Sequence, residues 1–333
     1  MVRRQTRKRK TLATRLAIFL GKTIAVLFVA AFFTSLVVVS IYKVQGDSVE
    51  GRAEKPANAV ADFAELISTE PEFIKKDPEP EPEPEPEPAP VKDVDFQAAV
   101  EAWAKKAGGQ AGVYIYDLDN EKVVADYHSN EKFSTASLYK LFVVYEGYRR
   151  LESGEWQETS KLGGTGKTIL KCLDLAIRES NSPCAEALHS KIGYNKMAKI
   201  IEDDFGLKNT SAKSLYSTPE EIAKMMKIFY EHKDITNADY LAQIKDSFLN
   251  QPKTTYDWRR GLPKGFSSKV DVYNKVGWEY YEEGKYWKIY NDAAIVKFKD
   301  ENRNFVVVEM TNKVGLSNIV NLGKTIEAEF YNN

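Results

Sequence analysis

The stretch Phe133-Ser-Thr-Ala-Ser-Leu-Tyr-Lys140 runs on into Leu-Phe-Val-Val-Tyr-Glu-Gly-Tyr-Arg-Arg150. The apolar residues after Ser137 recur at the spacing of a buried helix. Because Ser137 and Lys140 are three residues apart, their side chains would share one face of that helix. A serine hydroxyl is a weak nucleophile at neutral pH, but a neighbouring lysine can take its proton if burial lowers the lysine pKa. The pattern therefore predicts a nucleophile, Ser137, and its base, Lys140.

On its own, the Ser-x-x-Lys pattern decides little. The chain contains it three times, at Ser40/Lys43, Ser129/Lys132 and Ser137/Lys140. The first copy ends an apolar run and the second falls in a predicted hairpin, so only the third opens a long apolar helix. The alternative interpretation of the third copy is an N-capping serine beside a surface lysine. The rest of the chain has to separate these two interpretations.

Around this helix, residues 95–333 have the pattern of one globular domain. Alternating apolar residues predict five strands, two before the helix and three near the end: 111–117, 122–127, 270–276, 290–297 and 305–311. A helix carrying Phe96, Val100 and Trp103 precedes them, and an amphipathic helix at 317–331 ends the chain. The predicted fold class is α+β, an α/β sandwich. Terminal helices flank a five-stranded antiparallel sheet, and an all-helical subdomain is inserted.

The inserted subdomain spans about residues 150–250. Its predicted helices include 171–178, 184–192 and 194–205. A further helix begins at a capping box formed by Thr218 and Glu221, with Pro219 in the first turn. This role makes Glu220 and Glu221 structural residues rather than catalytic acids.

The N-terminus is basic and leads into an apolar segment. Residues 1–22 hold eight Lys/Arg and no acid, whereas from residue 94 onward 33 basic residues nearly balance 34 acidic ones. A nucleic-acid-binding protein would carry its positive charge on the folded domain, so we expect no nucleic-acid partner. Residues 23–42 are uncharged, mostly apolar and long enough to cross a bilayer as a helix. They predict a single-pass membrane helix with a cytoplasmic tail at 1–22 and everything after it outside.

A cleaved signal peptide is the competing interpretation of residues 23–42, and it is disfavoured because no Ala-x-Ala-like site follows. Residues 43–94 are then predicted to form a disordered linker. Within it, Asp77–Pro90 holds seven of the chain's 13 prolines, alternating with glutamate. In polyproline II conformation this piece would span on the order of 40 Å, at ~3.1 Å per residue. It is either a spacer between membrane and domain or a tail without a spacing role.

The chain has two cysteines, Cys172 and Cys184. Under the predicted topology both lie outside the cytoplasm, where disulfides persist. Two interpretations stay open, a disulfide between them or two buried free thiols.

Other motifs are assigned no function. Gly163–Thr168 imitates a phosphate loop, but Lys161 stands where the full pattern needs its first glycine, so this segment is predicted to begin a helix. His128, His189 and His232 lack the paired spacing of zinc ligands, and we expect each at the surface. We therefore expect neither a metal nor a cofactor.

Two later segments extend the pattern that begins at Ser137. Ser180-Asn-Ser182 lies between predicted helices, 43 residues after Ser137, and Lys275-Val-Gly277 lies in a predicted strand, 95 residues after Ser180. A Ser-x-x-Lys helix start, a Ser-x-Asn-like loop and a Lys-Thr-Gly-like strand, in this order, resemble class A β-lactamases and penicillin-binding proteins. The resemblance covers residues 95–333 and nothing in residues 1–94.

The resemblance implies a role for each matching residue. Ser137 would be the acylated nucleophile, Lys140 its base, and Ser180 the group that passes a proton to the leaving nitrogen. The backbone N–H groups of Ser137 and Trp278 would form the oxyanion hole. Substrate would contact Ser182, Lys275, Val276 and Gly277, with Lys275 holding a carboxylate.

The chain departs from the family pattern at three points. Ser182 stands where the family has asparagine, and Val276 stands where threonine is usual. No Glu-x-x-Leu-Asn segment is found, although class A β-lactamases use that glutamate to activate the deacylating water. The acids nearest in sequence, Glu202, Asp203 and Asp204, sit at a predicted helix end and are expected to be solvated.

Together, the N-terminal charge and apolar pattern and the resemblance of residues 95–333 predict a membrane-anchored extracytoplasmic serine hydrolase in a bacterial cell membrane. It would hydrolyse β-lactams through a Ser137 ester, with slow deacylation because the usual glutamate is missing. One alternative is a D-alanyl-D-alanine carboxypeptidase or penicillin-binding protein acting on peptidoglycan stem peptides. Two others are a sensing module that is acylated once without turnover and a catalytically silent wall-binding domain. We expect a monomer.

Overall fold

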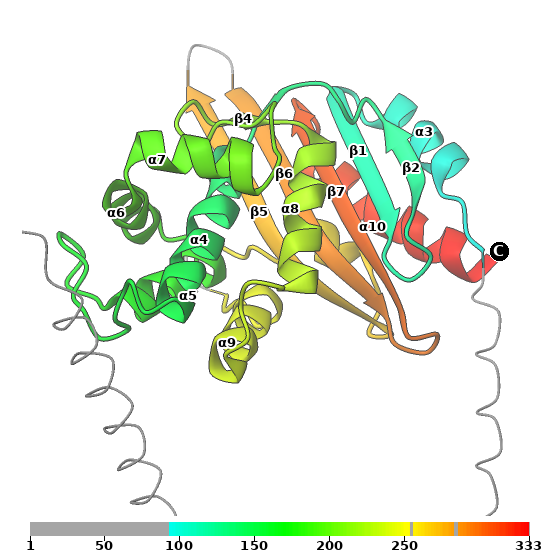
Figure 1. Ribbon diagram of the computed structural model, residues 1–333. Helices are drawn as coiled ribbons and strands as arrows, with labels where there is room; N and C mark the ends of the chain where they lie inside the picture. Colours follow the sequence, from blue (N-terminus) through cyan, green and yellow to red (C-terminus); the bar gives the residue numbers. More distant parts are fainter. Residues whose placement is uncertain (1–92, 254–255, 283–285, 333) are drawn as a thin grey trace, which may run out of the picture. The chain divides into compact units, whose positions relative to one another are not determined.

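The computed structural model describes residues 93–253, 256–282 and 286–332. One antiparallel sheet forms the centre of this domain, and helices cover both of its faces (Figure 1). The predicted membrane helix at 23–42 and residues 43–92 of the predicted linker lie outside the described residues. Within the described part of the chain, no helix is both long and apolar enough to cross a membrane.

The sheet contains five strands in the order β2-β1-β7-β6-β5, and every neighbouring pair is antiparallel. Strands from both ends of the domain thus join one sheet, which confirms the predicted α+β class. β5 and β6 are longer than predicted because their hairpin pairing continues beyond Gly277, as far as Glu282 opposite Tyr286. The strands are β1 (Gln110–Asp117), β2 (Lys122–Tyr127), β5 (Val270–Glu282), β6 (Tyr286–Phe298) and β7 (Arg303–Asn312).

The first and last helices of the domain cover one face of the sheet. They are α3 (Gln97–Lys106) and α10 (Leu316–Asn332), and the indole of Trp103 on α3 donates to the carbonyl of Asn318 on α10 at 2.7 Å. Aliphatic and aromatic side chains from both helices and from alternate strand positions form a closed core here. Burial of this apolar face is the main reason that α3 and α10 pack side by side on the sheet.

Two carboxyl groups are also buried beneath α10. Asp292 of β6 and Glu309 of β7 are opposite each other in the sheet, and both are fully buried. Asn274 donates to Asp292 at 2.7 Å, whereas neither carboxyl oxygen of Glu309 has a hydrogen-bond partner among the described residues. Burial raises the pKa of both groups, and the charge of Asp292 raises the pKa of Glu309 further.

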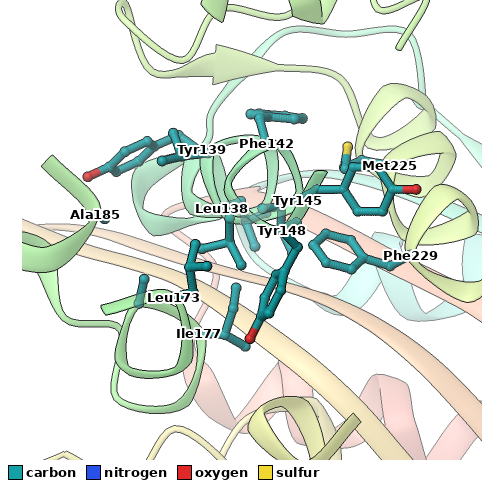
Figure 2. Packing of buried hydrophobic residues seen from close by; sticks show 14 of the residues in the cluster. Leu138, Tyr139, Phe142, Tyr145, Tyr148, Leu173, Ile177, Ala185, Met225 and Phe229 are labelled. Atoms are coloured by element: carbon teal, nitrogen blue, oxygen red, sulfur yellow. The ribbon is translucent and has the colours of Figure 1, made fainter. Parts of the chain in front are cut away.

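The inserted helices cover the opposite face. They are α4 (Lys140–Glu152), α5 (Ile169–Arg178), α6 (Ser182–Ile192), α7 (Tyr194–Lys199), α8 (Pro219–Glu231) and α9 (Ala238–Leu249). Figure 2 shows the side chains of α4 and of the turn before it packed among those of α5, α6 and α8. The Tyr145 and Phe229 rings meet edge to face, with centroids 5.0 Å apart. This packing makes α4 the central helix of the subdomain.

Two local predictions need correction or refinement. The helix predicted at 194–205 ends as α7 at Lys199, and a π-helical turn, Ile200–Asp204, follows it. Thr218 caps α8 by accepting from the amide of Glu221 at 3.2 Å. Only this half of the predicted capping box forms, because the Glu221 carboxylate accepts instead from Asn209 and Thr210.

The glycine-rich segment before α5 behaves as predicted. Thr168 is the N-cap of that helix, and its hydroxyl accepts a hydrogen bond from the amide of Lys171 at 3.3 Å. Gly163–Thr168 is therefore the loop leading into α5.

Candidate active site

Ser137 lies on a tight turn immediately before α4. The turn is a 3₁₀ segment, η1 (Ala136–Tyr139), so the nucleophile predicted at the start of an α-helix lies one turn ahead of it. Ala136 has φ +43°, a left-handed conformation that costs of order 1 kcal/mol or more for a residue with a side chain. Lys140 begins α4 and is fully buried, while Ser137 is half-buried.

Strand β5 approaches this turn very closely. A Cβ atom placed on Gly277 would lie 2.4 Å from the carbonyl oxygen of Thr135 and 2.8 Å from the side chain of Leu138. Only glycine fits such a contact. Asn291 of β6 adds a second link by donating to the Ser134 carbonyl at 2.7 Å. The sheet therefore holds the segment that carries Ser137 on both sides of the nucleophile.

The loop between α5 and α6 supplies Ser180 and Ser182. Ser180 has φ +53°, and Asn181 caps α6 by accepting from the amide of Cys184 at 3.0 Å. Cys172 of α5 and Cys184 of α6 are joined by a disulfide, with their Cα atoms 4.9 Å apart. The loop is thus clamped between two covalently linked helices.

Two lysines from different elements converge on Ser180. Nζ of Lys140 lies 3.2 Å from the Ser180 hydroxyl and 3.0 Å from the Ser182 hydroxyl, and it also donates to the Ser180 carbonyl. Nζ of Lys275 on β5 donates to the same Ser180 hydroxyl at 2.9 Å. Residues far apart in the sequence, on η1–α4, the α5–α6 loop and β5, are therefore within one hydrogen-bond network.

Burial changes the proton affinity of both lysines. It lowers the pKa of Lys140 to about 8, against a smaller opposing effect of the Glu186 carboxylate. Burial and the charge of Lys140 lower the pKa of Lys275 well below its usual value, with Asp292 opposing this. A lysine with a pKa near 8 is partly neutral at physiological pH and can accept a proton.

Ser137 and Ser182 line an open cleft of about 500 Å³ between the sheet and the helical subdomain. One wall carries Trp278 and Glu279 of β5, and the other carries residues of α6. Within the described part of the chain, no hydrogen bond joins the Ser137 hydroxyl to Lys140. Ser182 connects the two residues, because it lines the cleft beside Ser137 and its hydroxyl accepts from Nζ of Lys140 at 3.0 Å.

The remaining predicted site residues are placed as follows. Val276 is buried, and its carbonyl oxygen accepts from Nζ of Lys275 at 2.7 Å. Trp278 packs against Tyr290 with ring centroids 5.4 Å apart, and its indole N–H is buried without a partner. It is therefore the carbonyl of Val276, and not its side chain, that contacts a neighbouring site residue.

Among the cleft residues that were not predicted from the sequence are His189, Glu186 and Glu279. His189 was expected at the surface, but it is 3% exposed, lines the cleft and has an unpartnered Nε2. Glu186 lines the same wall, and Glu279 lines the opposite one. Ser182, Glu186 and His189 are spaced i, i+4 and i+7 on α6, so helical periodicity read from Ser182 would have found both missed residues on that helix.

A larger hollow, of about 600 Å³, lies between α8, α9 and the far ends of the strands. None of the predicted site residues lines it. Among the described residues, no cluster of three or more His, Cys, Asp or Glu side chains is placed to hold a metal ion.

Sequence comparison identifies the family. A sequence model described as the β-lactamase enzyme family matches residues 95–331. The chain belongs to this family. The resemblance noted from the three motifs is thereby confirmed for the domain as a whole, and the domain is a β-lactamase-family serine hydrolase fold. A comparison with curated proteins finds no match.

Solved structures similar to this β-lactamase-family domain include enzymes of two kinds. An ancestral class A β-lactamase, representing the last common ancestor of Gram-negative bacteria, is 15% identical with a TM-score of 0.61, covering 70% of this chain and 99% of that one. PBP-A is 14% identical with a TM-score of 0.61, covering 73% and 99%. A β-lactamase from Desulfarculus baarsii is 14% identical with a TM-score of 0.60, covering 71% and 97%. At these identities, the similarity establishes the fold.

Proposed function

We propose that this β-lactamase-family chain is an acyl-transferring serine hydrolase that forms an ester on Ser137. The observation that carries the proposal is the convergence of Lys140 and Lys275 on the Ser180 hydroxyl, at 3.2 and 2.9 Å, beside a cleft that Ser137 lines. Such a network can move protons to and from a serine without histidine.

In the acylation step, neutral Lys140 takes the proton of the Ser137 hydroxyl, and the oxygen attacks the substrate carbonyl carbon. The backbone N–H groups of Ser137 and Trp278 stabilise the negative charge on the carbonyl oxygen, an effect worth ~3–4 kcal/mol per donor in such sites. Ser180 donates its proton to the leaving nitrogen and regains one from a neighbouring lysine. The amide bond breaks, and the acyl group stays on Ser137.

The substrates proposed are β-lactams, which carry a strained amide and an acidic group. A D-alanyl-D-alanine peptide of peptidoglycan is the second candidate, because the fold is shared equally with PBP-A, a variant of which was solved as an acyl-enzyme complex with penicillin G. A sensor that is acylated once and a silent wall-binding domain are the remaining alternatives.

The proposal places the domain outside the bacterial cell membrane. Residues 23–42 would anchor it, with residues 1–22 in the cytoplasm and the Glu-Pro-rich segment as a tether. The support is the charge and apolar pattern of the sequence.

Labelling with a fluorescent penicillin tests the function. The full chain in membranes is incubated with the probe, and the adduct is located by mass spectrometry of tryptic peptides. We expect an adduct on Ser137, which Ser137→Ala abolishes and which Ser190→Ala, an exposed serine on α6 outside the cleft, leaves unchanged.

The lifetime of the adduct separates the alternatives. A transient adduct with accumulating product indicates a hydrolase, and a persistent one indicates a sensor. No adduct, or labelling that survives Ser137→Ala, would overturn the proposed site.

A further inference from the structure

Hydrolysis of a Ser137 ester needs a base that activates water, and the sequence supplies none at the usual place. The acids closest in sequence to that place are Glu202, Asp203 and Asp204. None of them lines the Ser137 cleft, and Asp204 pairs instead with Arg149 at 2.9 Å. The carboxylates that do line the cleft are Glu186 and Glu279.

Glu186 is placed by α6. Ser182 opens this helix with its hydroxyl 3.0 Å from Nζ of Lys140, and Glu186 lies four residues later on the same face. One helical turn rises about 5.4 Å, so the carboxylate lies one turn along the cleft wall from the lysine network. Ser137 lines the same cleft.

Glu186 is also free to act. Its side chain is exposed, and it makes no hydrogen bond or ion pair with the residues that the structure describes. Glu186 is the carboxylate whose charge raises the pKa of Lys140, so the two groups interact electrostatically. An unpaired carboxylate open to water and close to the base of the first step is suited to the second step.

Glu279 differs from Glu186 in its position and in its exposure. It lies on the opposite wall, on β5 two residues after Gly277, and one of its carboxyl oxygens is buried without a partner. A half-buried carboxylate on the β5 wall is suited to contacting a bound ligand. It is less suited to holding a water molecule beside Lys140.

We propose that Glu186 is the general base of deacylation, which activates the water that hydrolyses the Ser137 ester. This inference rests on the proposed function. Water gives one proton to the Glu186 carboxylate while its oxygen bonds to the ester carbonyl carbon. The bond from that carbon to Oγ of Ser137 then breaks as the proton on Glu186 passes through the amine of Lys140 to Oγ, so that Glu186 and Lys140 return to their starting states. The products are the free acid and the original serine.

The test measures acylation and deacylation separately in the full chain. Rapid mixing with a chromogenic cephalosporin gives the burst, and intact-protein mass spectrometry after removal of free substrate gives the decay of the adduct. For Glu186→Gln we expect deacylation to slow by ~100-fold or more while acylation changes by less than ~3-fold, because a positioned base contributes about 10²–10⁴-fold to its own step. The acyl-enzyme should then accumulate.

Two matched variants carry the same chemical change. Glu202→Gln removes an exposed carboxylate outside the cleft, and we expect wild-type decay of the adduct. Glu279→Gln removes the other cleft carboxylate, and we expect its effect to fall on substrate binding rather than on decay. Because Glu186 is exposed, Glu186→Gln should keep the wild-type melting temperature, which excludes misfolding as the cause of slow decay.

Several results would overturn the assignment. Equal adduct lifetimes in wild type and Glu186→Gln would do so, as would slow decay in Glu279→Gln alone. If Glu186 acted only by raising the pKa of Lys140, Glu186→Gln would shift the pH profile of acylation to lower pH and leave the deacylation rate unchanged. Failure of the proposed function looks different, because the wild-type chain would then form no adduct on Ser137.

Discussion

Lys140 combines full burial with three hydrogen-bond acceptors and a pKa near 8. At pH 7 about a tenth of molecules would carry it neutral, and the fraction rises with pH because the neutral amine is the deprotonated form. If the neutral amine is the base, the acylation rate rises with pH and levels off above about 8. Burst kinetics between pH 6 and 9 measure this profile.

Lys140→Arg tests the same role without changing the charge. The guanidinium stays protonated at every usable pH, so we expect acylation to fall by about 10²–10⁴-fold and to lose its rise with pH. The matched control is Lys132→Arg, an exposed lysine of the second Ser-x-x-Lys copy, for which we expect wild-type kinetics. Near-normal acylation by Lys140→Arg would show that the base lies elsewhere.

The contact between β5 and the turn before α4 determines where the nucleophile stands. In Gly277→Ala the new methyl group would press on the Thr135 carbonyl, and the hydrogen bond from Asn291 to the neighbouring Ser134 carbonyl restrains this segment from moving away. We expect a loss of ~1–3 kcal/mol in the free energy of unfolding and an acylation rate lower by about 10²-fold. Urea denaturation and burst kinetics measure the two effects.

Gly163→Ala is the control for that substitution. Gly163 is exposed, and a Cβ atom there would meet nothing within 4 Å. We expect wild-type stability and kinetics from this variant. If Gly277→Ala behaved in the same way, the close approach of β5 would not matter for the site.

The order of elements could be read from the sequence because strand and helix periods are local signals, and the strands at 111–117 and 305–311 were placed almost correctly. The convergence of Lys140, Ser180 and Lys275 followed from motif order. His189 was missed because a single histidine does not reveal which helix face is buried. The partners of Glu221 were missed because Asn209 and Thr210 come near it only through the tertiary fold.

The stability of the domain as a unit should depend on pH through Glu309. Its pKa is raised in the folded state, so the folded protein binds more protons than the unfolded chain and stability falls as pH rises above the unfolded pKa. Glu309→Gln removes this dependence. We expect its stability advantage over wild type to widen between pH 5 and 8, by up to about 1.4 kcal/mol per pH unit.

Chemical denaturation at pH 5, 6.5 and 8 measures that difference. Glu301→Gln removes an exposed carboxylate from the turn before β7. The difference in unfolding free energy between this variant and wild type should not change with pH. A flat difference for Glu309→Gln as well would mean that the buried carboxyl is not kept protonated by its surroundings.

Because a disulfide joins α5 and α6, the conformation of the Ser180 loop depends on whether the protein's surroundings are oxidising or reducing. Thiol-rich surroundings such as cytosol would leave the sulfur atoms apart, and the loop would lose its clamp. Ser180 and Ser182, which that loop holds beside Nζ of Lys140, would then be less firmly placed.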